Sequence, residues 1–242
     1  MNNHDDSSAF PPLSEEDFTL PNVQLPNNIR MMHLVDVLLK TPQQFFEHIR
    51  SEQPLLHYNI KLILLAFIGL AIYGVIMGSF TGGVQWVAVP IKVMVGTTIS
   101  ALLCYPSLYI LAALSGADLR PAQIATLLSS ALALTAILLL GFAPIAFVFT
   151  FSIQTLEFMG AIHLLLGFGS LYFGVRYLAQ GLEAMDSQDS SFIKFWLIVF
   201  VVTLLQMSTT LRPILGQEEY LLTSEKKFFL VHWSESLEKL RH

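Results

Sequence analysis

The chain has 242 residues, of which 54% are hydrophobic and only 13% are charged. A soluble domain has about 25% charged residues, and here most charges lie toward the two ends while the middle is nearly uncharged. The net charge of −5 excludes a general basic surface for nucleic acid. The single cysteine, Cys104, excludes an intrachain disulfide and a cysteine-based metal site. This composition predicts an integral membrane protein whose first partner is the lipid bilayer, with no nucleic-acid partner.

The N-terminal part of the chain divides into an acidic tail and a helical segment. Residues 1–29 contain four prolines and five acidic residues but no Lys or Arg, which predicts a disordered tail. Residues 30–60 predict amphipathic helices on the cytoplasmic face of the membrane, because Thr41, Pro42 and Gln44 suit the N-cap, N1 and N3 positions of a capping box. The apolar side of this helix is formed by Phe45, Phe46 and Ile49.

Residues 61–211 contain the apolar stretches of the chain. A helix that crosses a bilayer needs roughly 20 mostly apolar residues, and its backbone groups must be hydrogen-bonded internally. We therefore predict an all-α transmembrane helical bundle with five spans, at about 62–80, 93–114, 122–142, 158–177 and 195–210. The third apolar stretch is too long for one span, so we expect a helix break at Pro144 and an apolar connection up to Glu157.

The distribution of Lys and Arg in the short loops predicts the orientation of the spans. Arg50 and Lys61 precede the first span, Arg120 follows the second, and Arg176 and Lys194 flank the loop after the fourth. The loops after the first and third spans contain no Lys or Arg. This bias places the N-terminus in the cytoplasm and, with five spans, the C-terminus outside.

The C-terminal segment, residues 212–242, predicts an amphipathic tail. Its apolar residues fall on one helical face, so it could lie flat on the outer membrane face or bind a helix of another protein. Its Lys and Arg residues argue mildly for the opposite, cytoplasmic side.

Lys92 is the only charged residue between Lys61 and Asp118. It lies six residues after Trp86, at the outer start of the second predicted span. We interpret it as a lysine whose aliphatic stem lets the ammonium reach the headgroups. The alternative is a functional charge within the membrane. Glu157, at the outer start of the fourth span, is the possible partner for an ion pair on the outer side.

The fourth span carries the most regular pattern of the chain, because its glycines are spaced by seven and polar residues follow three positions later. The pattern predicts a helix-packing seam of Gly160, His163, Gly167, Ser170 and Gly174. His163 is interpreted as a hydrogen-bond partner between helices, since the other histidines fall outside the spans. A leucine at Gly167 is expected to push the neighbouring helix away.

A second packing stripe is predicted in the first span, from Gly74, Gly78 and Gly82. Small residues at such spacing let helix backbones approach closely in a membrane. These stripes either pack the five helices of one subunit or form a homodimer.

No motif for catalysis, for a cofactor or for a metal stands out, and the apolar stretches hold no pair of carboxylates. We therefore predict no catalytic, cofactor-binding or metal-binding residue, and a protein that is not an enzyme.

The chain resembles the Yip1 family over about residues 38–212. The resemblance rests on the "PxxFFxxI" pattern from Pro42 to Ile49 before the first span, on five closely spaced glycine-rich spans, and on the segment Tyr105–Gln123 between the second and third spans. Eukaryotic members act in vesicle traffic and carry an Asp-Leu-Tyr-Gly-Pro signature, which is missing here. The resemblance to bacterial members implies a multi-pass protein of a bacterial inner membrane, without a known reaction.

Two functions follow as hypotheses. The first is a non-enzymatic scaffold or accessory factor of a membrane complex, with a membrane-protein partner or a second copy of the chain. The alternative is a small permease or a transporter or channel subunit. A water-lined cavity with Gln206, Thr209 and His163 would favour the alternative, and a dry bundle packed on glycines would favour the scaffold.

Overall fold

The computed structural model describes residues 30–51, 54–80, 82–116, 119–152, 155–185 and 191–210. Within these ranges the chain forms helices and no strands. The helices are α1 (Met31–Lys40), α2 (Pro42–Arg50), α3 (Leu56–Ser79), α4 (Gln85–Leu114), α5 (Pro121–Ser152), α6 (Leu156–Glu183) and α7 (Ser191–Thr210). The predicted tails at 1–29 and 212–242 lie outside the described residues.

Four of these helices, α3 to α6, are long and apolar enough to cross a membrane. The apolar part of α7, Phe192–Met207, is shorter. The described part of the chain is therefore an all-α membrane protein with four candidate spanning helices, and α7 is an additional apolar helix packed beside them.

The predicted break at Pro144 is wrong, because α5 continues through this proline to Ser152. Proline removes one backbone donor, but spanning helices tolerate it where neighbouring groups and small local adjustments satisfy the freed carbonyl. The same holds in α4, which contains Pro90 and Pro106 and begins at Gln85, well before the predicted start of the second span.

Close packing links the five long helices in the order α7, α4, α3, α5, α6. α3 packs closely against both α4 and α5, while α7 packs on α4 and α6 packs on α5. Neither α6 with α7 nor α6 with α4 is among the closely packed pairs of the described residues. On one side of the bundle, α3 therefore packs closely between α4 and α5. On the other side, α6 is only loosely joined to α4 and α7.

Glycines explain why α3 lies so close to its two neighbours. A Cβ atom at Gly69 would lie 2.9 Å from the Cβ of Ala136 in α5, and one at Gly74 would lie 2.6 Å from the Cα of Pro90 in α4. Without side chains at these positions the backbones can approach closely. The resulting van der Waals packing is one of the interactions that hold helices together in lipid.

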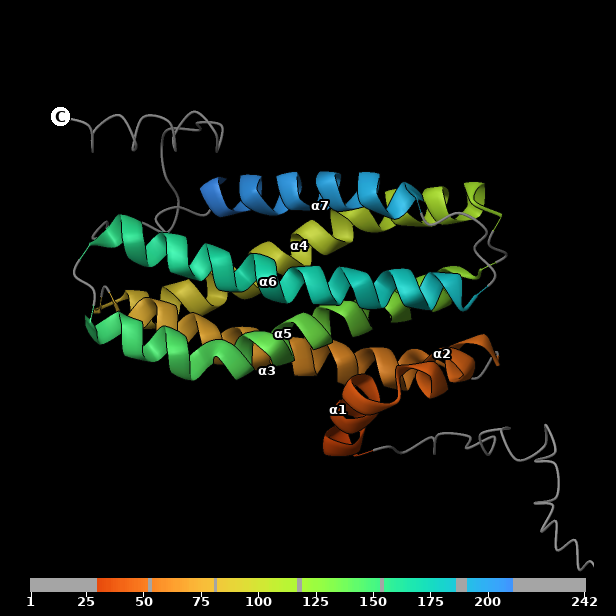
Figure 1. The fold of residues 1–242 in the computed structure, drawn as a ribbon, viewed down its shortest axis with the longest axis horizontal. Helices are drawn as coiled ribbons and strands as arrows, with labels where there is room; N and C mark the ends of the chain where they lie inside the picture. The colour runs from red at the N-terminus through yellow and green to blue at the C-terminus, as the bar shows by residue number, and fades with distance from the viewer. Residues whose placement is uncertain are drawn as a thin grey trace, which may run out of the picture.

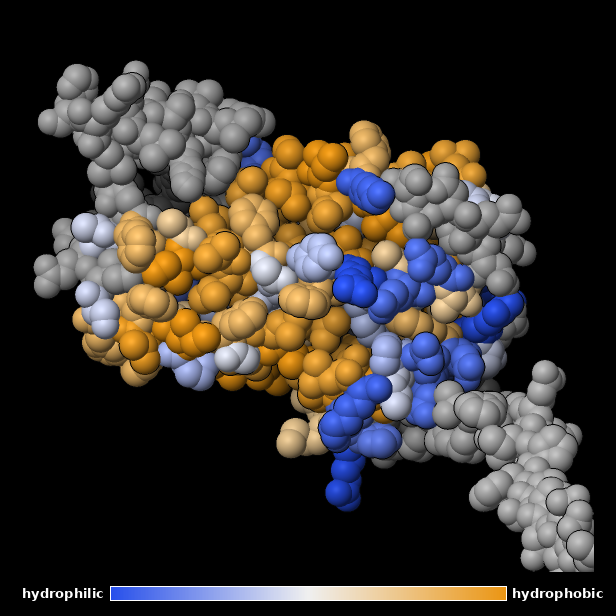
Figure 2. Space-filling model, viewed as in Figure 1, coloured by the Kyte–Doolittle hydropathy of each residue, from blue (hydrophilic) through white to orange (hydrophobic). Residues whose placement is uncertain are grey.

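Consecutive long helices run in opposite directions, so one end of the bundle collects the start of α3, α5 and α7 (Figure 1). The helices α1 and α2 lie at this end. Hydrophobic residues cover most of the visible length of the bundle, and hydrophilic residues gather toward the end with α1 and α2 (Figure 2). This distribution suits a body embedded in lipid with one polar end.

The helix α2 is attached to the bundle by buried aromatic and polar contacts. The Phe46 ring packs on Tyr177 of α6 at a centroid distance of 4.9 Å, and the Phe45 ring lies 6.1 Å from Tyr58 of α3. The Gln123 side chain of α5 donates a 3.0 Å hydrogen bond to the Ile49 carbonyl. The apolar side of α2 is therefore buried against protein and does not face lipid.

The start of α2 follows the expected positions without the expected bond. Thr41 is the N-cap and Pro42 begins the helix, but no side-chain hydrogen bond caps it. The reciprocal part of a capping box occurs instead at α5, where the Arg120 backbone amide donates to the Gln123 side-chain oxygen at 2.9 Å.

Candidate functional site

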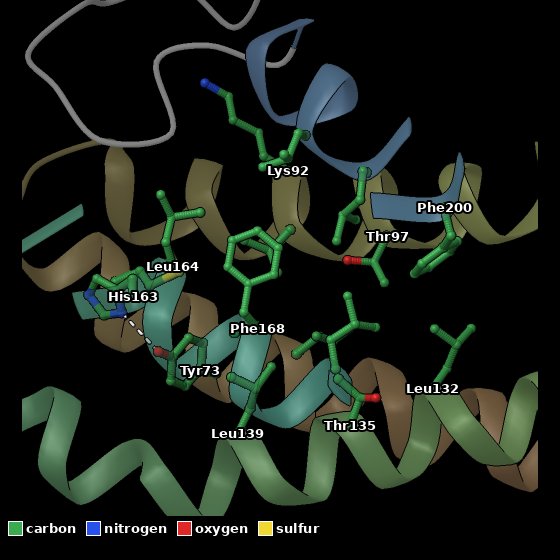
Figure 3. Close-up of a pocket in the computed structure, with 18 residues that line it drawn as sticks. Tyr73, Lys92, Thr97, Leu132, Thr135, Leu139, His163, Leu164, Phe168 and Phe200 are labelled. Atoms are coloured by element: carbon green, nitrogen blue, oxygen red, sulfur yellow. Dashed lines mark hydrogen bonds between the residues drawn. The ribbon is translucent and has the colours of Figure 1, made fainter. Parts of the chain in front are cut away.

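A pocket of about 190 Å³ lies among the long helices, on the side where α6 and α7 are loosely joined. All five long helices contribute to its wall (Figure 3). The lining residues are Leu70, Tyr73, Met77, Lys92, Val93, Gly96, Thr97, Leu132, Thr135, Leu139, His163, Leu164, Gly167, Phe168, Leu171, Phe200, Leu204 and Leu205. Most of them are apolar, and the few polar groups therefore decide what else the pocket can bind.

The first polar feature is a pair between α3 and α6. The Tyr73 hydroxyl and His163 Nδ1 are 2.9 Å apart, and the two rings meet edge to face with centroids 5.5 Å apart (Figure 3). His163 is only 5% exposed, and its other ring nitrogen has no hydrogen-bond partner among the described residues. The bond gives the histidine the partner on another helix that the sequence predicts for it.

The second polar feature is a threonine hydroxyl on α4. The Thr97 oxygen points into the pocket (Figure 3). Thr135 on the opposite wall differs, because its hydroxyl donates to the Ala131 carbonyl of its own helix at 2.8 Å. The Thr97 hydroxyl therefore faces the space that a bound molecule would occupy.

Lys92 lines the pocket with its aliphatic stem. It lies inside α4 and not at a helix start, and it is only 4% exposed. Its ammonium points away from the pocket (Figure 3). The proposed ion pair of Lys92 with Glu157 falls outside the described side chains, because only the backbone of Glu157 is described.

The structure divides the predicted seam of α6 into two halves. A Cβ atom at Gly174 would lie 2.8 Å from the Ala131 carbonyl oxygen of α5, so this glycine permits a close helix contact. Gly160 and Gly167 have no atom within 4 Å of such a position. Gly167 instead borders the pocket, so the structure shows no close helix contact at this glycine of the expected seam. Ser170, between the two halves, is buried and its hydroxyl lacks a described partner.

The second stripe is also divided. Gly74 and Gly78 of α3 face the start of α4, where an added Cβ would meet the backbone of Pro90 and of Gln85. Gly82 does not pack, because it lies in the connection after α3 with a φ of 74° and open space around it. Its role is to form the turn, since only glycine adopts this conformation without cost.

Sequence reasoning missed three members of the pocket. Tyr73 is the one tyrosine in the apolar middle of α3, which is a signal for a buried hydrogen bond. Thr97 lies between ordinary packing residues and has no distinguishing pattern. Phe200 lines the pocket from α7. Trp196, one turn earlier, stacks on the Phe200 ring with centroids 5.1 Å apart, and its indole N–H donates a 3.0 Å hydrogen bond to the Cys104 carbonyl. This bond fixes α7 on α4.

Among the described residues, no group of three or more His, Cys, Asp or Glu side chains is placed to hold a metal ion. The polar side chains that line the pocket are Tyr73, Lys92, Thr97, Thr135 and His163, within a mostly apolar wall.

Comparison of the chain with known protein families, with characterised proteins and with solved structures gives no match. The resemblance to the Yip1 family therefore remains a proposal that rests on the sequence pattern.

Proposed function

We propose that this protein is a Yip1-like, non-enzymatic scaffold or accessory factor of a membrane complex. It crosses a bacterial inner membrane five times, with α7 as the fifth span, a cytoplasmic N-terminus and an external C-terminus. The partner is another membrane protein or a second copy of the chain. The observation that carries the proposal is the attachment of α2 to one end of the bundle by buried aromatic and polar contacts.

A scaffold needs a surface that keeps its position relative to the membrane. The α2 helix supplies one, because its buried side is held by Phe46 on α6 and by the Gln123 bond from α5. Its outward side exposes Gln43 and Glu47. A partner bound there would be held at a defined distance and orientation to the spanning helices.

The test is site-specific photo-cross-linking in intact cells of the source organism. A photoactivatable amino acid is placed at Gln43 or Glu47, and at Ile68 on the outer side of α3 as a matched position outside α1 and α2. We expect one defined protein adduct from the α2 positions, absent at Ile68 and lost when Gln123→Leu removes the anchor. No adduct from α2, or the same adducts at all three positions, would contradict the scaffold.

The pocket gives a specific reason to retain the alternative of a small permease or transporter subunit. It is lined mainly by apolar residues, which suits a lipophilic solute better than an ion. Uptake of labelled solutes by vesicles containing the pure protein distinguishes the two functions. Transport without any other protein, abolished by filling the pocket at Gly167, would favour the permease and contradict the scaffold.

A further inference from the structure

The pocket has properties beyond those that a scaffold requires, and its depth in the bundle is the first. Thr97 lies about 18 Å along α4 from Gln85 and about 25 Å from Leu114, at 1.5 Å per residue. The hydrocarbon core of a bilayer is about 30 Å thick, so a residue at this position lies at the level of the lipid chains. Molecules that reach the pocket sideways are therefore acyl chains and not headgroups.

The second property is an opening toward the side of the bundle. Phe168 lines the pocket and is nevertheless 41% exposed, so the pocket reaches the surface beside its ring. Leu204 and Leu205 of α7 line the same region and are partly exposed. α6 is not closely packed against α7 or α4, so this side of the pocket lies between helices that are only loosely joined.

The third property is the match between the pocket and an alkyl chain. Its volume of about 190 Å³ exceeds the ~150 Å³ of an engineered apolar cavity that stays dry and binds benzene. Its wall is formed mostly by leucine, phenylalanine, methionine and valine, with Tyr73, Thr97, Thr135 and His163 as its polar members. The ammonium of Lys92 points away from the space (Figure 3). Such a wall binds a neutral chain and offers little to an ion.

The fourth property is the role of Gly167. A Cβ atom at this glycine would meet no atom within 4 Å, and the residue borders the pocket, so the missing side chain enlarges the space. Gly169, two residues further along α6, also has open space but does not line the pocket. The two glycines therefore provide a matched pair for an experiment.

We propose that this pocket binds one acyl chain of a bilayer lipid, which enters sideways between α6 and α7. The chain lies along Phe168, Leu204 and Phe200, while the headgroup of the same lipid remains in the interface. This binding goes beyond the proposed scaffold function and does not depend on it, because it requires no protein partner.

The experiment uses the full chain reconstituted in phosphatidylcholine nanodiscs that contain phosphatidylcholine with a photoactivatable diazirine in one acyl chain. After illumination, lipid adducts are assigned to residues by mass spectrometry. We expect adducts on the pocket residues of α6 and α7 in the wild type and in Gly169→Leu. In Gly167→Leu they should fall about tenfold, because the leucine side chain occupies the space that the acyl chain needs; tenfold corresponds to about 1.4 kcal/mol of binding free energy.

Adducts on the outward-facing residues Phe147 and Phe151 of α5 serve as the internal reference for lipid that merely surrounds the protein. They should be equal in all variants. Equal pocket labelling in Gly167→Leu and the wild type, or no pocket labelling above this reference, would overturn the proposal. Thermal unfolding reports whether each variant is folded, and Thr97→Leu fills the same space from α4 if Gly167→Leu does not fold.

A second measurement separates lipid from other occupants of the opening. Phe168 is replaced by a photoactivatable phenylalanine analogue in the same nanodiscs. An adduct with phospholipid supports the proposal, whereas an adduct with a second copy of the chain assigns the opening to a protein contact and overturns it.

Discussion

At the level of single residues, the glycines of the spanning helices have two opposite roles. Gly69, Gly74 and Gly174 lie against the backbone of a neighbouring helix, whereas Gly160 and Gly167 face open space. A seven-residue spacing on α6 includes glycines of both kinds, so spacing alone does not distinguish a contact from a cavity.

This difference predicts the effect of adding a single methyl group. Gly74→Ala places a Cβ 2.6 Å from the Pro90 Cα, a backbone atom that cannot move away cheaply, so we expect a loss of about 1–3 kcal/mol in the free energy of unfolding. Gly160→Ala, with no atom nearby, should leave stability unchanged or raise it by up to about 1 kcal/mol through helix propensity. Thermal unfolding in detergent measures both, and equal losses would contradict the assigned contacts.

At the level of elements, the attachment of α2 depends on one glutamine that performs two tasks. The Gln123 side chain donates to the Ile49 carbonyl and accepts from the Arg120 amide. Gln123→Leu removes both bonds and leaves the buried carbonyl unpaired, which typically costs about 1–3 kcal/mol. We expect faster amide exchange in α2, residues 42–50, with little change in α3.

Gln123→Glu is the matched control for this prediction. Its carboxylate can still accept from the Arg120 amide but cannot donate to Ile49. If α2 is held by the Gln123 donor, Glu should release α2 as Leu does while preserving the start of α5. Normal exchange in α2 with either variant would show that the aromatic contacts alone hold it.

The attachment of α2 should also depend on pH through His48. This side chain is buried against the Tyr58 ring at 4.7 Å, and its Nε2 atom has no described hydrogen-bond partner. Burial lowers the pKa of His48 below the usual histidine value of about 6.5. The released helix therefore binds a proton more readily than the attached helix does. The contribution of neutral His48 to the attachment of α2 is therefore complete above the usual histidine pKa of about 6.5, and it is lost as the pH falls toward the lowered pKa.

Amide exchange in α2, corrected for its intrinsic pH dependence, should therefore become faster as the pH is lowered from about 7.5 to about 5.5. His48→Phe keeps an aromatic ring against Tyr58 and removes the titrating group, so its corrected exchange should not change over this range. A wild type that is equally insensitive would show that His48 is not protonated on release.

Comparison of sequence and structure at this level shows which features local patterns determine. The positions of α3 and α6 follow from the lengths of their apolar stretches and from the charged residues that flank these stretches. The continuation of α5 through Pro144 could not be predicted, because it depends on neighbouring groups that satisfy the freed carbonyl. The pocket could not be predicted either, since Tyr73, Thr97 and His163 line one space only through the order of helices in the bundle.

At the level of the whole molecule, we propose that the chain crosses the bilayer five times with α1 and α2 in the cytoplasm. Four helices satisfy the length and hydropathy of a span, while α7 is shorter in its apolar part and is fixed on α4 by the Trp196 bond to Cys104. Its crossing decides on which side the C-terminal segment lies, and therefore which surfaces a cytoplasmic partner can reach.

The most direct measurement is labelling of single cysteines by a membrane-impermeant maleimide, in a Cys104→Ala background. Cysteines are placed at Gln43 in α2, at Val84 between α3 and α4, at Ala184 after α6, and at Ser234 in the C-terminal segment. Five crossings predict labelling of Val84→Cys and Ser234→Cys in intact cells, and of the other two only after the membrane is opened. Protection of Ser234→Cys in intact cells, with Val84→Cys labelled, would contradict the fifth crossing.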